Sequence, residues 1–368
     1  MAEKKKFVFC SPVTPIDKIH RYRPYFEIPT SATRLGFIAY LIVGRLKFNY
    51  DGPVLITETG IDSNKHRDVP KTLASILQFL KKEQPDIFLF FHMNLILPLI
   101  VIASRIFLRN HKVKFAIKLD WGGDNFGELG KMMVLRNILL AFESLFVDRL
   151  IIENNCGFEA LNAIPLLRKK KIIVIPNTYS EQFIMPTSYE IGPRFPVILS
   201  VSRISPEKGL DVLVKAFASM SRKYTDWSVQ IVGPIEDHSY VEKLKGMIND
   251  FNLGSKVSLL GPLYDEELRK LYLRASIFCL PSIEESFGIA RVEAIAAGLP
   301  VVTSEAGCGL DFEEMGSLVF KVGDVEGLKN HLRKLISNNE LRTEIAKKQQ
   351  AHLLTYDQIT EKLVSSLL

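Results

Sequence analysis

The feature that most constrains the fold is a short apolar run, rich in β-branched residues, that recurs between helical patterns. Such runs lie at 7–10, 54–57, 87–91, 115–119, 150–153 and 172–175, and again at 197–201, 229–232, 257–260, 277–280, 301–303 and 318–320. Apolar strands that alternate with helices are typical of a parallel sheet covered on both faces. Two such sets predict an α/β chain with two doubly wound domains.

The chain length agrees with two domains, because 368 residues exceed the usual size of one. Residues 180–196 are rich in Pro, Ser and Gly and lack periodicity, so we expect the boundary there. The first domain would then span residues 1–190 and the second residues 194–353.

The charge is distributed unevenly between the two halves. Residues 1–190 contain 26 Lys and Arg against 18 Asp and Glu, a net charge of +8, and the remainder has a net charge of −2. Two interpretations stay open. The domains simply differ in composition, or the N-terminal half meets an anionic membrane surface or a phosphorylated acceptor. Nothing indicates a nucleic-acid partner.

Three apolar segments bear on membrane contact. In the segment 87–108, His92, Asn94, Pro98 and Arg105 interrupt the apolar run, so we expect a buried strand and then a core helix rather than a membrane span. The segments 34–49 and 131–150 are apolar with Arg and Lys at or near their ends. Each is either a helix at a membrane interface or a segment packed under the sheet.

The four cysteines, Cys10, Cys156, Cys279 and Cys308, lie far apart in the sequence. This spacing argues against a metal cluster or a disulfide framework and favours a reducing, cytoplasmic compartment. The start of the chain shows no secretory signal, because the apolar run after Lys6 is too short.

Polar loops follow the strands of the second half, where an open α/β sheet binds its ligands. Arg203 and Lys208 follow the strand at 197–201, and two cations at the mouth of a sheet suit a diphosphate. After the strand at 277–280, Ser286 is a candidate N-cap for a helix from residue 287 to about 297. The first amides of that helix, at Phe287, Gly288 and Ile289, would form an anion site.

Two glutamates, eight residues apart, bracket this helix start. Glu285 precedes it in the loop, and Glu293 lies almost two turns inside the helix. An inward carboxylate needs partners, which the paired hydroxyl groups of a ribose would supply. The alternative is that Glu293 pairs with Arg291 or Arg203 in the protein core.

These residues resemble the nucleotide-sugar half of the retaining glycosyltransferases of family 4. The resemblance rests on "LSVSRISPEKGLDVLVKAF" and on the segment from "VSLLGPLYDEELRK" to "PSIEESFGIARVEAIAAGLPVVTSEAGCG". It implies the GT-B fold, in which two Rossmann-like domains face each other across a cleft. The C-terminal segment at about 354–368 is similar to the helix that completes the first domain of that fold.

The resemblance also implies roles for the site residues. Glu293 would bind the donor ribose, and Glu285 the hydroxyls of the donor sugar. Arg203 and Lys208 would hold the diphosphate, while the 287–289 amides face the sugar and phosphates. The implied reaction moves a hexose, with retention, from a UDP- or GDP-sugar to a hydroxyl of a glycan or lipid-linked acceptor. The enzyme would act at the inner face of the plasma membrane.

No D-x-D triplet occurs in the sequence, so we expect no metal and no cofactor beyond the donor. The N-terminal half departs from the family pattern, because Asp120 follows the strand at 115–119 where many members carry a histidine. Asp120 would orient the donor sugar or the acceptor hydroxyl, or else only cap its loop. His92 either faces the cleft or is a core histidine.

Other classes of protein remain as alternatives. A dinucleotide oxidoreductase would need a G-x-G-x-x-G fingerprint, which the sequence lacks. A phosphorylase would need a cofactor lysine that the sequence does not identify. A transferase with a soluble acceptor and a nucleotide-sugar-binding protein without catalysis both stay open.

Overall fold

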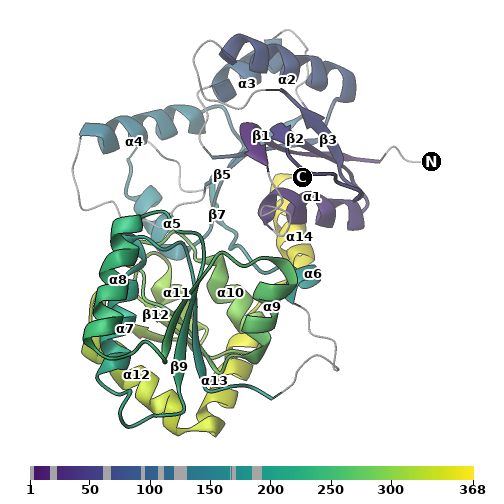
Figure 1. Cartoon of the computed structure of the whole chain (residues 1–368). Helices are drawn as coiled ribbons and strands as arrows, with labels where there is room; N and C mark the ends of the chain where they lie inside the picture. The colour runs from purple at the N-terminus through teal and green to yellow at the C-terminus, as the bar shows by residue number, and fades with distance from the viewer. Residues whose placement is uncertain are drawn as a thin grey trace. The chain divides into compact units, whose positions relative to one another are not determined.

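The computed structural model describes residues 4–16, 23–60, 68–92, 96–106, 112–119, 131–165, 167, 171–184 and 193–368, without the side chains of residues 13, 15 and 131–137. The chain forms two compact units, and in Figure 1 the first is drawn in purple to teal, with its C-terminal helix in yellow, and the second in teal-green to yellow. Unit 1 runs to Asn177 and also includes Leu354–Leu368, and unit 2 comprises Thr178–Leu353. The division at Asn177 lies just before the predicted linker.

Unit 1 contains a seven-stranded parallel sheet in the order β3-β2-β1-β4-β5-β6-β7. Its strands are β1 (Lys6–Ile16), β2 (Ile38–Leu46), β3 (Leu55–Glu58), β4 (Ile87–Phe91), β5 (Lys114–Leu119), β6 (Arg149–Ile152) and β7 (Ile172–Val174). The order reverses between β1 and β4, which is the doubly wound arrangement that the alternating apolar runs predict.

Helices cover both faces of this sheet. One core joins it to α2 (Val69–Glu83), α3 (Ile96–Ile106), α4 (Lys131–Ser144) and α5 (Asn155–Asn162). The opposite core joins it to α1 (Pro24–Arg34) and α14 (Tyr356–Leu367). The C-terminal helix therefore belongs to unit 1, where Tyr356, Ile359 and Leu363 are buried beside strand residues.

One sequence-based alternative is wrong, because the segment 34–49 does not form an interfacial helix. Its centre is the strand β2, which pairs with β1 on one side and with β3 on the other. Residues 39–44 are buried. A strand buried on both faces carries no polar alternation, so its sequence can be mistaken for that of an apolar helix.

The other two apolar segments are resolved as follows. The segment 87–108 contains β4 and then α3, as predicted. The segment 131–150 contains α4, whose Leu140 and Ala141 are buried while Ile138 and Phe142 are exposed. Of the helices in the described part of the chain, none is long and apolar enough to cross a membrane.

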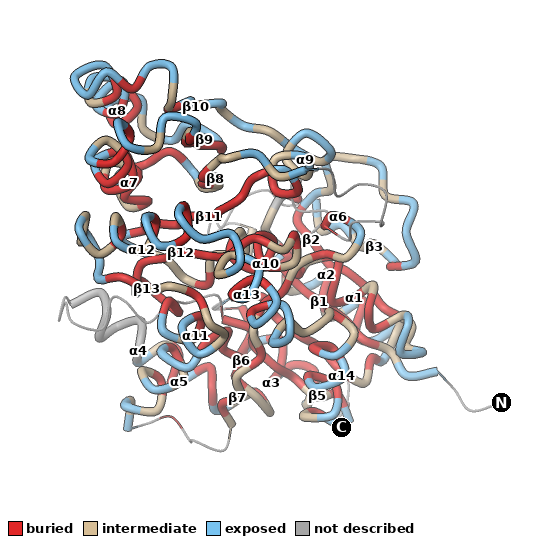
Figure 2. Tube along the Cα trace, turned by 90° about the horizontal axis from the view of Figure 1, so that it is seen from below, coloured by how far each residue is buried: buried red, intermediate tan, exposed pale blue. Residues whose placement is uncertain are grey.

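Unit 2 contains a six-stranded parallel sheet in the order β10-β9-β8-β11-β12-β13, again doubly wound. These strands are β8 (Val197–Val201), β9 (Ser228–Val232), β10 (Val257–Gly261), β11 (Ile277–Leu280), β12 (Val301–Ser304) and β13 (Leu318–Phe320). The tube in Figure 2 shows β8, β11 and β12 as largely buried segments. Both sheets confirm the predicted fold class.

The helices of unit 2 lie on both faces of its sheet, with α7, α8 and α12 on one face and α9 and α10 on the other (Figure 1), while α13 contributes Ile345 to the core of the first face. The elements are α6 (Glu181–Ile184), the 3₁₀ turn η5 (Pro206–Lys208), α7 (Leu210–Ala218), α8 (His238–Asp250), α9 (Asp265–Arg274), α10 (Ile289–Ala296), α11 (Gly309–Glu314), α12 (Val325–Ser337) and α13 (Asn339–Gln350). The strand order reverses between β8 and β11, so the loops after these two strands flank the expected ligand crevice.

Candidate functional site

The loops after β8 and β11 meet through a buried ion pair. The ammonium nitrogen of Lys208, in η5, lies 3.0 Å from Oε2 of Glu285, which belongs to the loop before α10. The Ser282 hydroxyl donates to the same carboxylate oxygen at 3.2 Å. The two charged side chains are only 9% and 11% exposed. The structure thus brings together two residues that lie 77 positions apart in the sequence.

Arg203 lies at the same edge of the sheet but has different partners. Its side chain is 49% exposed and forms ion pairs with Glu236 at 2.6 Å and with Glu207 at 3.3 Å. Glu207 pairs with Arg203 and feels the charge of Lys208. Burial raises the pKa of its carboxyl, but the Ser205 hydroxyl, its own backbone amide and the charges of Arg203 and Lys208 outweigh burial and lower it. The Arg203 side chain at this edge of the sheet is therefore held in place by the carboxylates of Glu236 and Glu207.

Glu293 is buried in α10 and points to α9. The hydroxyl of Tyr272 donates to its Oε2 at 2.9 Å. Arg203 is paired with Glu236 and Glu207, and Arg291 turns to Ala306 and Cys308. Neither arginine is the partner of Glu293, so the core ion pair considered from the sequence is not formed.

The start of α10 differs from the prediction. Its N-cap is Gly288 rather than Ser286, and the helix begins at Ile289. Gly288 has a φ of 70°, a conformation that a residue with a side chain rarely adopts, so the chain turns there and not earlier. The Phe287 side chain is buried against Phe312, and its carbonyl accepts from the Cys308 thiol at 3.1 Å. The orphan amides therefore begin after the predicted position.

Arg291 is a member of this site that the sequence indicated only as a partner for Glu293. Its side chain is fully buried, and its guanidinium lies 5.2 Å from the centre of the Phe312 ring. It donates to the Ala306 carbonyl at 3.2 Å, but Nε has no acceptor, and no carboxylate pairs with it among the described residues. A Cβ placed on Gly288 would lie 3.1 Å from Nε. An uncompensated cation under a helix N-terminus favours anion binding there.

Glycines allow the loops of unit 2 to approach one another. Gly307, in the loop between β12 and α11, has a φ of +62°, and a Cβ there would lie 2.1 Å from the Glu285 carbonyl oxygen. Gly209, after η5, has a φ of +58° and would place a Cβ 2.2 Å from the Pro281 carbonyl oxygen. The loop that carries Glu285 is thus packed between two neighbours.

The candidates of unit 1 give a different result. Asp120 lies outside the described residues. His92 follows β4 with a φ of 65° and is exposed, so it is not a core histidine. A buried cluster that the sequence did not predict lies near the carboxyl ends of β5, β6 and β7, where Lys118 and Asn177 both donate to Glu153. An isolated lysine in the apolar run 115–119 was its only signal.

A metal centre does not appear in the part of the chain that the structure describes. No group of three or more His, Cys, Asp or Glu side chains there could hold a metal ion. Among the described residues, the cationic side chains discussed at this end of unit 2 are those of Arg203, Lys208 and Arg291.

Two doubly wound units with a polar site at the carboxyl ends of the strands define the GT-B class of glycosyltransferases. Residues 163–352, more than half of the chain, match the family described as Glycosyl transferases group 1. The chain therefore belongs to this family.

Curated relatives match over part of the chain. An uncharacterized glycosyltransferase of Haemophilus influenzae is 31% identical over 171 residues, which cover 45% of this chain and 46% of the relative. Sulfoquinovosyl transferase SQD2 of Arabidopsis thaliana is also 31% identical over 171 residues, covering 45% of this chain and 31% of the relative. The matched part thus spans less than half of these curated relatives.

Solved structures resemble the whole chain. Sucrose-phosphate synthase from Thermosynechococcus elongatus has a TM-score of 0.75 at 16% identity, covering 98% of both chains. HepE of Anabaena, in complex with UDP and glucose, has a TM-score of 0.73 at 18% identity, covering 99% of both chains. At such low identity, the likeness supports the fold alone.

Proposed function

We propose that the protein transfers a hexose, with retention, from a nucleotide-diphosphate sugar to a hydroxyl of a glycan or lipid-linked acceptor, as enzymes of glycosyltransferase family 4 do. One observation carries the proposal. The buried pair of Lys208 and Glu285 places a cation and a carboxylate side by side, close in sequence to the N-terminus of α10. A diphosphate linked to a sugar requires both kinds of group, the cation for the phosphates and the carboxylate for the hydroxyls.

The donor is bound by the loops of unit 2 in this proposal. Arg203 and Lys208 hold the diphosphate, together with the Gly288 and Ile289 amides. Glu285 accepts hydrogen bonds from the sugar hydroxyls, and Glu293 accepts them from the ribose. Tyr272 already orients the Glu293 carboxylate from the core, so that group needs little rearrangement to receive a ligand.

These residues have the following roles in the proposed reaction. The acceptor hydroxyl attacks the anomeric carbon from the face that the diphosphate leaves, and the leaving phosphate takes the hydroxyl proton. Lys208 and Arg203 stabilise the charge that develops on the leaving oxygen, aided by the dipole of α10. Glu285 orients the sugar and is not the nucleophile. No divalent metal takes part, so EDTA leaves the rate unchanged.

The donor assignment is tested by binding. A thermal-shift panel of UDP-, GDP- and ADP-sugars is expected to show a concentration-dependent rise in Tm for the true donor. In calorimetry, Glu293→Ala and Arg203→Ala weaken the binding of that donor while the fold persists. If both variants bind it as the wild type does, the donor site lies elsewhere.

Catalysis needs a separate test, because a protein that binds a nucleotide sugar without turnover would give the same result in the binding experiments. Incubation of a radiolabelled donor with the protein and a membrane extract is expected to release the nucleotide and label a glycan or lipid. Binding without turnover would identify a nucleotide-sugar-binding protein. Label that appears only in a water-soluble product would identify a soluble acceptor.

The acceptor surface is proposed to be the inner face of the plasma membrane. On α3, Leu99, Ile102 and Ile106 are exposed, and on α4, so are Ile138 and Phe142. Leu145 follows α4 and lines a hollow together with Arg105, Arg149 and Lys171. Exposed apolar side chains beside cations suit an anionic lipid surface, at about 1 kcal/mol for each basic residue near it.

Membrane binding is tested by co-sedimentation with liposomes. The protein is expected to bind phosphatidylserine vesicles at low salt and to be released by high salt. The double variant Phe142→Asp, Leu145→Asp lowers binding, whereas Leu260→Asp, an exposed leucine of unit 2, does not. Equal capture by anionic and neutral vesicles would contradict the proposal.

A further inference from the structure

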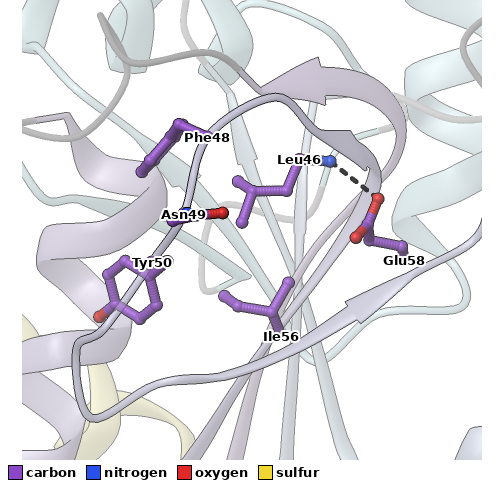
Figure 3. Close-up of a pocket in the computed structure, with 6 residues that line it drawn as sticks. All are labelled: Leu46, Phe48, Asn49, Tyr50, Ile56 and Glu58. Atoms are coloured by element: carbon purple, nitrogen blue, oxygen red, sulfur yellow. Dashed lines mark hydrogen bonds between the residues drawn. The ribbon is translucent and has the colours of Figure 1, made fainter.

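We propose that a hollow at the carboxyl ends of β2 and β3 in unit 1 binds a hexose unit of the acceptor glycan. The hollow has a volume of about 500 Å³ and is lined by Leu46, Phe48, Asn49, Tyr50, Ile56 and Glu58 (Figure 3). Leu46 ends β2 and Glu58 ends β3, so the hollow opens at the edge of the sheet where α/β folds bind ligands. Its volume lies in the range of small-molecule sites.

The lining combines apolar and polar groups in the way a sugar requires. Figure 3 shows Leu46 and Ile56 between the aromatic residues of the loop on one side and Glu58 on the other. A hexose presents apolar C–H groups on the faces of its ring and hydroxyl groups around its edge. The apolar lining suits the ring faces, and Asn49 and Glu58 suit the hydroxyls.

The polar groups of the hollow have capacity for a ligand. The Leu46 amide donates to Oε2 of Glu58 at 3.0 Å, which fixes the position of the carboxylate. Among the described residues, Oε1 of Glu58, the Asn49 amide and the Tyr50 hydroxyl have no hydrogen-bond partner. The Glu58 oxygen can accept a hydrogen bond from a ligand, and the Asn49 amide and the Tyr50 hydroxyl can each donate or accept one.

The aromatic residues that line the hollow pack against the core of unit 1. The ring of Phe26, a buried residue of α1, lies 4.9 Å from the ring of Tyr50 and 5.7 Å from that of Phe48, measured between centroids. Phe26 therefore positions both rings before any ligand arrives. A preformed lining lowers the entropic cost of binding a small, rigid ring.

The charges of the hollow select against a phosphate. Among the described residues that line it, Glu58 is the single charged one, and none is Lys or Arg. Arg45 and Lys47 are exposed neighbours in the sequence that do not contribute to the lining. An anionic nucleotide is therefore disfavoured, whereas a neutral sugar is not.

The assignment to the acceptor rests on the proposed function. The donor groups belong to unit 2, so a sugar site in unit 1 serves the second substrate of a transferase. Sugar binding itself is measurable without any assumption about the donor.

The test uses the full chain and three probes, namely the methyl α-glycosides of glucose, galactose and mannose. Saturation-transfer difference NMR is expected to detect at least one of them with the wild type. Tyr50→Ala and Glu58→Gln weaken binding by about tenfold, since each removes about 1.4 kcal/mol of interaction. In Glu58→Gln the side-chain amide retains an oxygen for the Leu46 amide, so the loop keeps its anchor.

Two controls separate this inference from the proposed function. Lys47→Ala alters an exposed side chain of the same loop and is expected to bind the glycoside as the wild type does. The thermal shift with UDP or GDP is expected to be unchanged in Tyr50→Ala and Glu58→Gln, which shows that unit 2 is intact. No signal with any of the three glycosides, or an equal signal in all variants, would overturn the hexose site. Failure of both nucleotides to bind the wild type would instead overturn the donor proposal.

Discussion

The ammonium nitrogen of Lys208 lies 3.0 Å from the Glu285 carboxylate, and both side chains are almost fully buried. Each charge compensates the other within the protein. A bound diphosphate would compete with Glu285 for Lys208, and the sugar hydroxyls would replace Lys208 at Glu285. The ion pair thus leaves neither buried charge uncompensated until the donor arrives.

The first prediction concerns the stability of this pair. Lys208→Met leaves Glu285 buried without its cation, and Glu285→Gln leaves Lys208 without its carboxylate. Each single variant is expected to lower the free energy of unfolding by about 3 kcal/mol. The double variant costs less than the sum of the two, because no unpaired charge remains. Urea unfolding of the wild type, the two single variants and the double variant measures these free energies. Strictly additive losses would show that the two residues are not coupled.

The second prediction separates the role of Glu285 from nucleotide binding. Glu285→Gln removes the charge that orients the sugar but leaves the Lys208 ammonium for the phosphates. Turnover of the nucleotide sugar is expected to fall by about tenfold or more, while UDP or GDP affinity stays within about threefold. Steady-state rates and calorimetry on the same preparation give both values. An unchanged rate with weakened nucleotide affinity would place Glu285 at the phosphates instead.

The third prediction uses two glycines with similar backbone strain. Gly307 and Gly323 have φ values of +62° and +76°, but a Cβ on Gly307 would meet the Glu285 carbonyl oxygen at 2.1 Å, while a Cβ on Gly323 meets nothing within 4 Å. Gly323→Ala is expected to cost about 1 kcal/mol of stability through strain alone. Gly307→Ala costs more and also weakens donor binding, because the Glu285 loop must move. Equal effects in both variants would show that the contact is unimportant.

The sequence predicted the fold well because its signals are local. Each apolar run fills one strand between two helical layers, and the spacing of the runs is enough to predict two parallel sheets. The exception is β2, which is buried on both faces over residues 39–44. Because burial on both faces removes the alternation that marks a strand, the sequence left a helix open as an alternative.

The candidate site was predicted in part, since strand ends can be located from sequence but side-chain partners cannot. The positions of Lys208 and Glu285 follow from the ends of β8 and β11, yet their ion pair depends on how η5 folds back. Arg291 has no carboxylate partner among the described residues, and no sequence pattern indicates a missing counter-ion. The hollow beside Tyr50 depends on the conformation of the loop after β2, which has no periodicity to interpret.

The last prediction concerns how the C-terminal helix is held in unit 1. The Asp357 carboxylate at the start of α14 accepts from Nε of Arg34 at 2.8 Å and from the Ser31 hydroxyl at 2.5 Å, both on α1. Burial raises the pKa of Asp357, but these hydrogen bonds and the charge of Arg34 outweigh burial and lower it. A carboxyl whose folded pKa lies below its unfolded value contributes stability above the unfolded pKa, about 3.9, and loses it as the pH falls through the folded pKa.

The variant Arg34→Met isolates this contribution. Because both side chains are 42% exposed, solvent screening limits the ion pair to about 0.5 kcal/mol. The wild type is therefore expected to be more stable than Arg34→Met by that amount at about pH 7, and the difference should vanish at about pH 2, where Asp357 is protonated in both states. Added salt at neutral pH should reduce the difference as well. Urea-unfolding midpoints at the two pH values measure it, and a gap that stays constant with pH would mean that Arg34 stabilises α14 by packing rather than by charge.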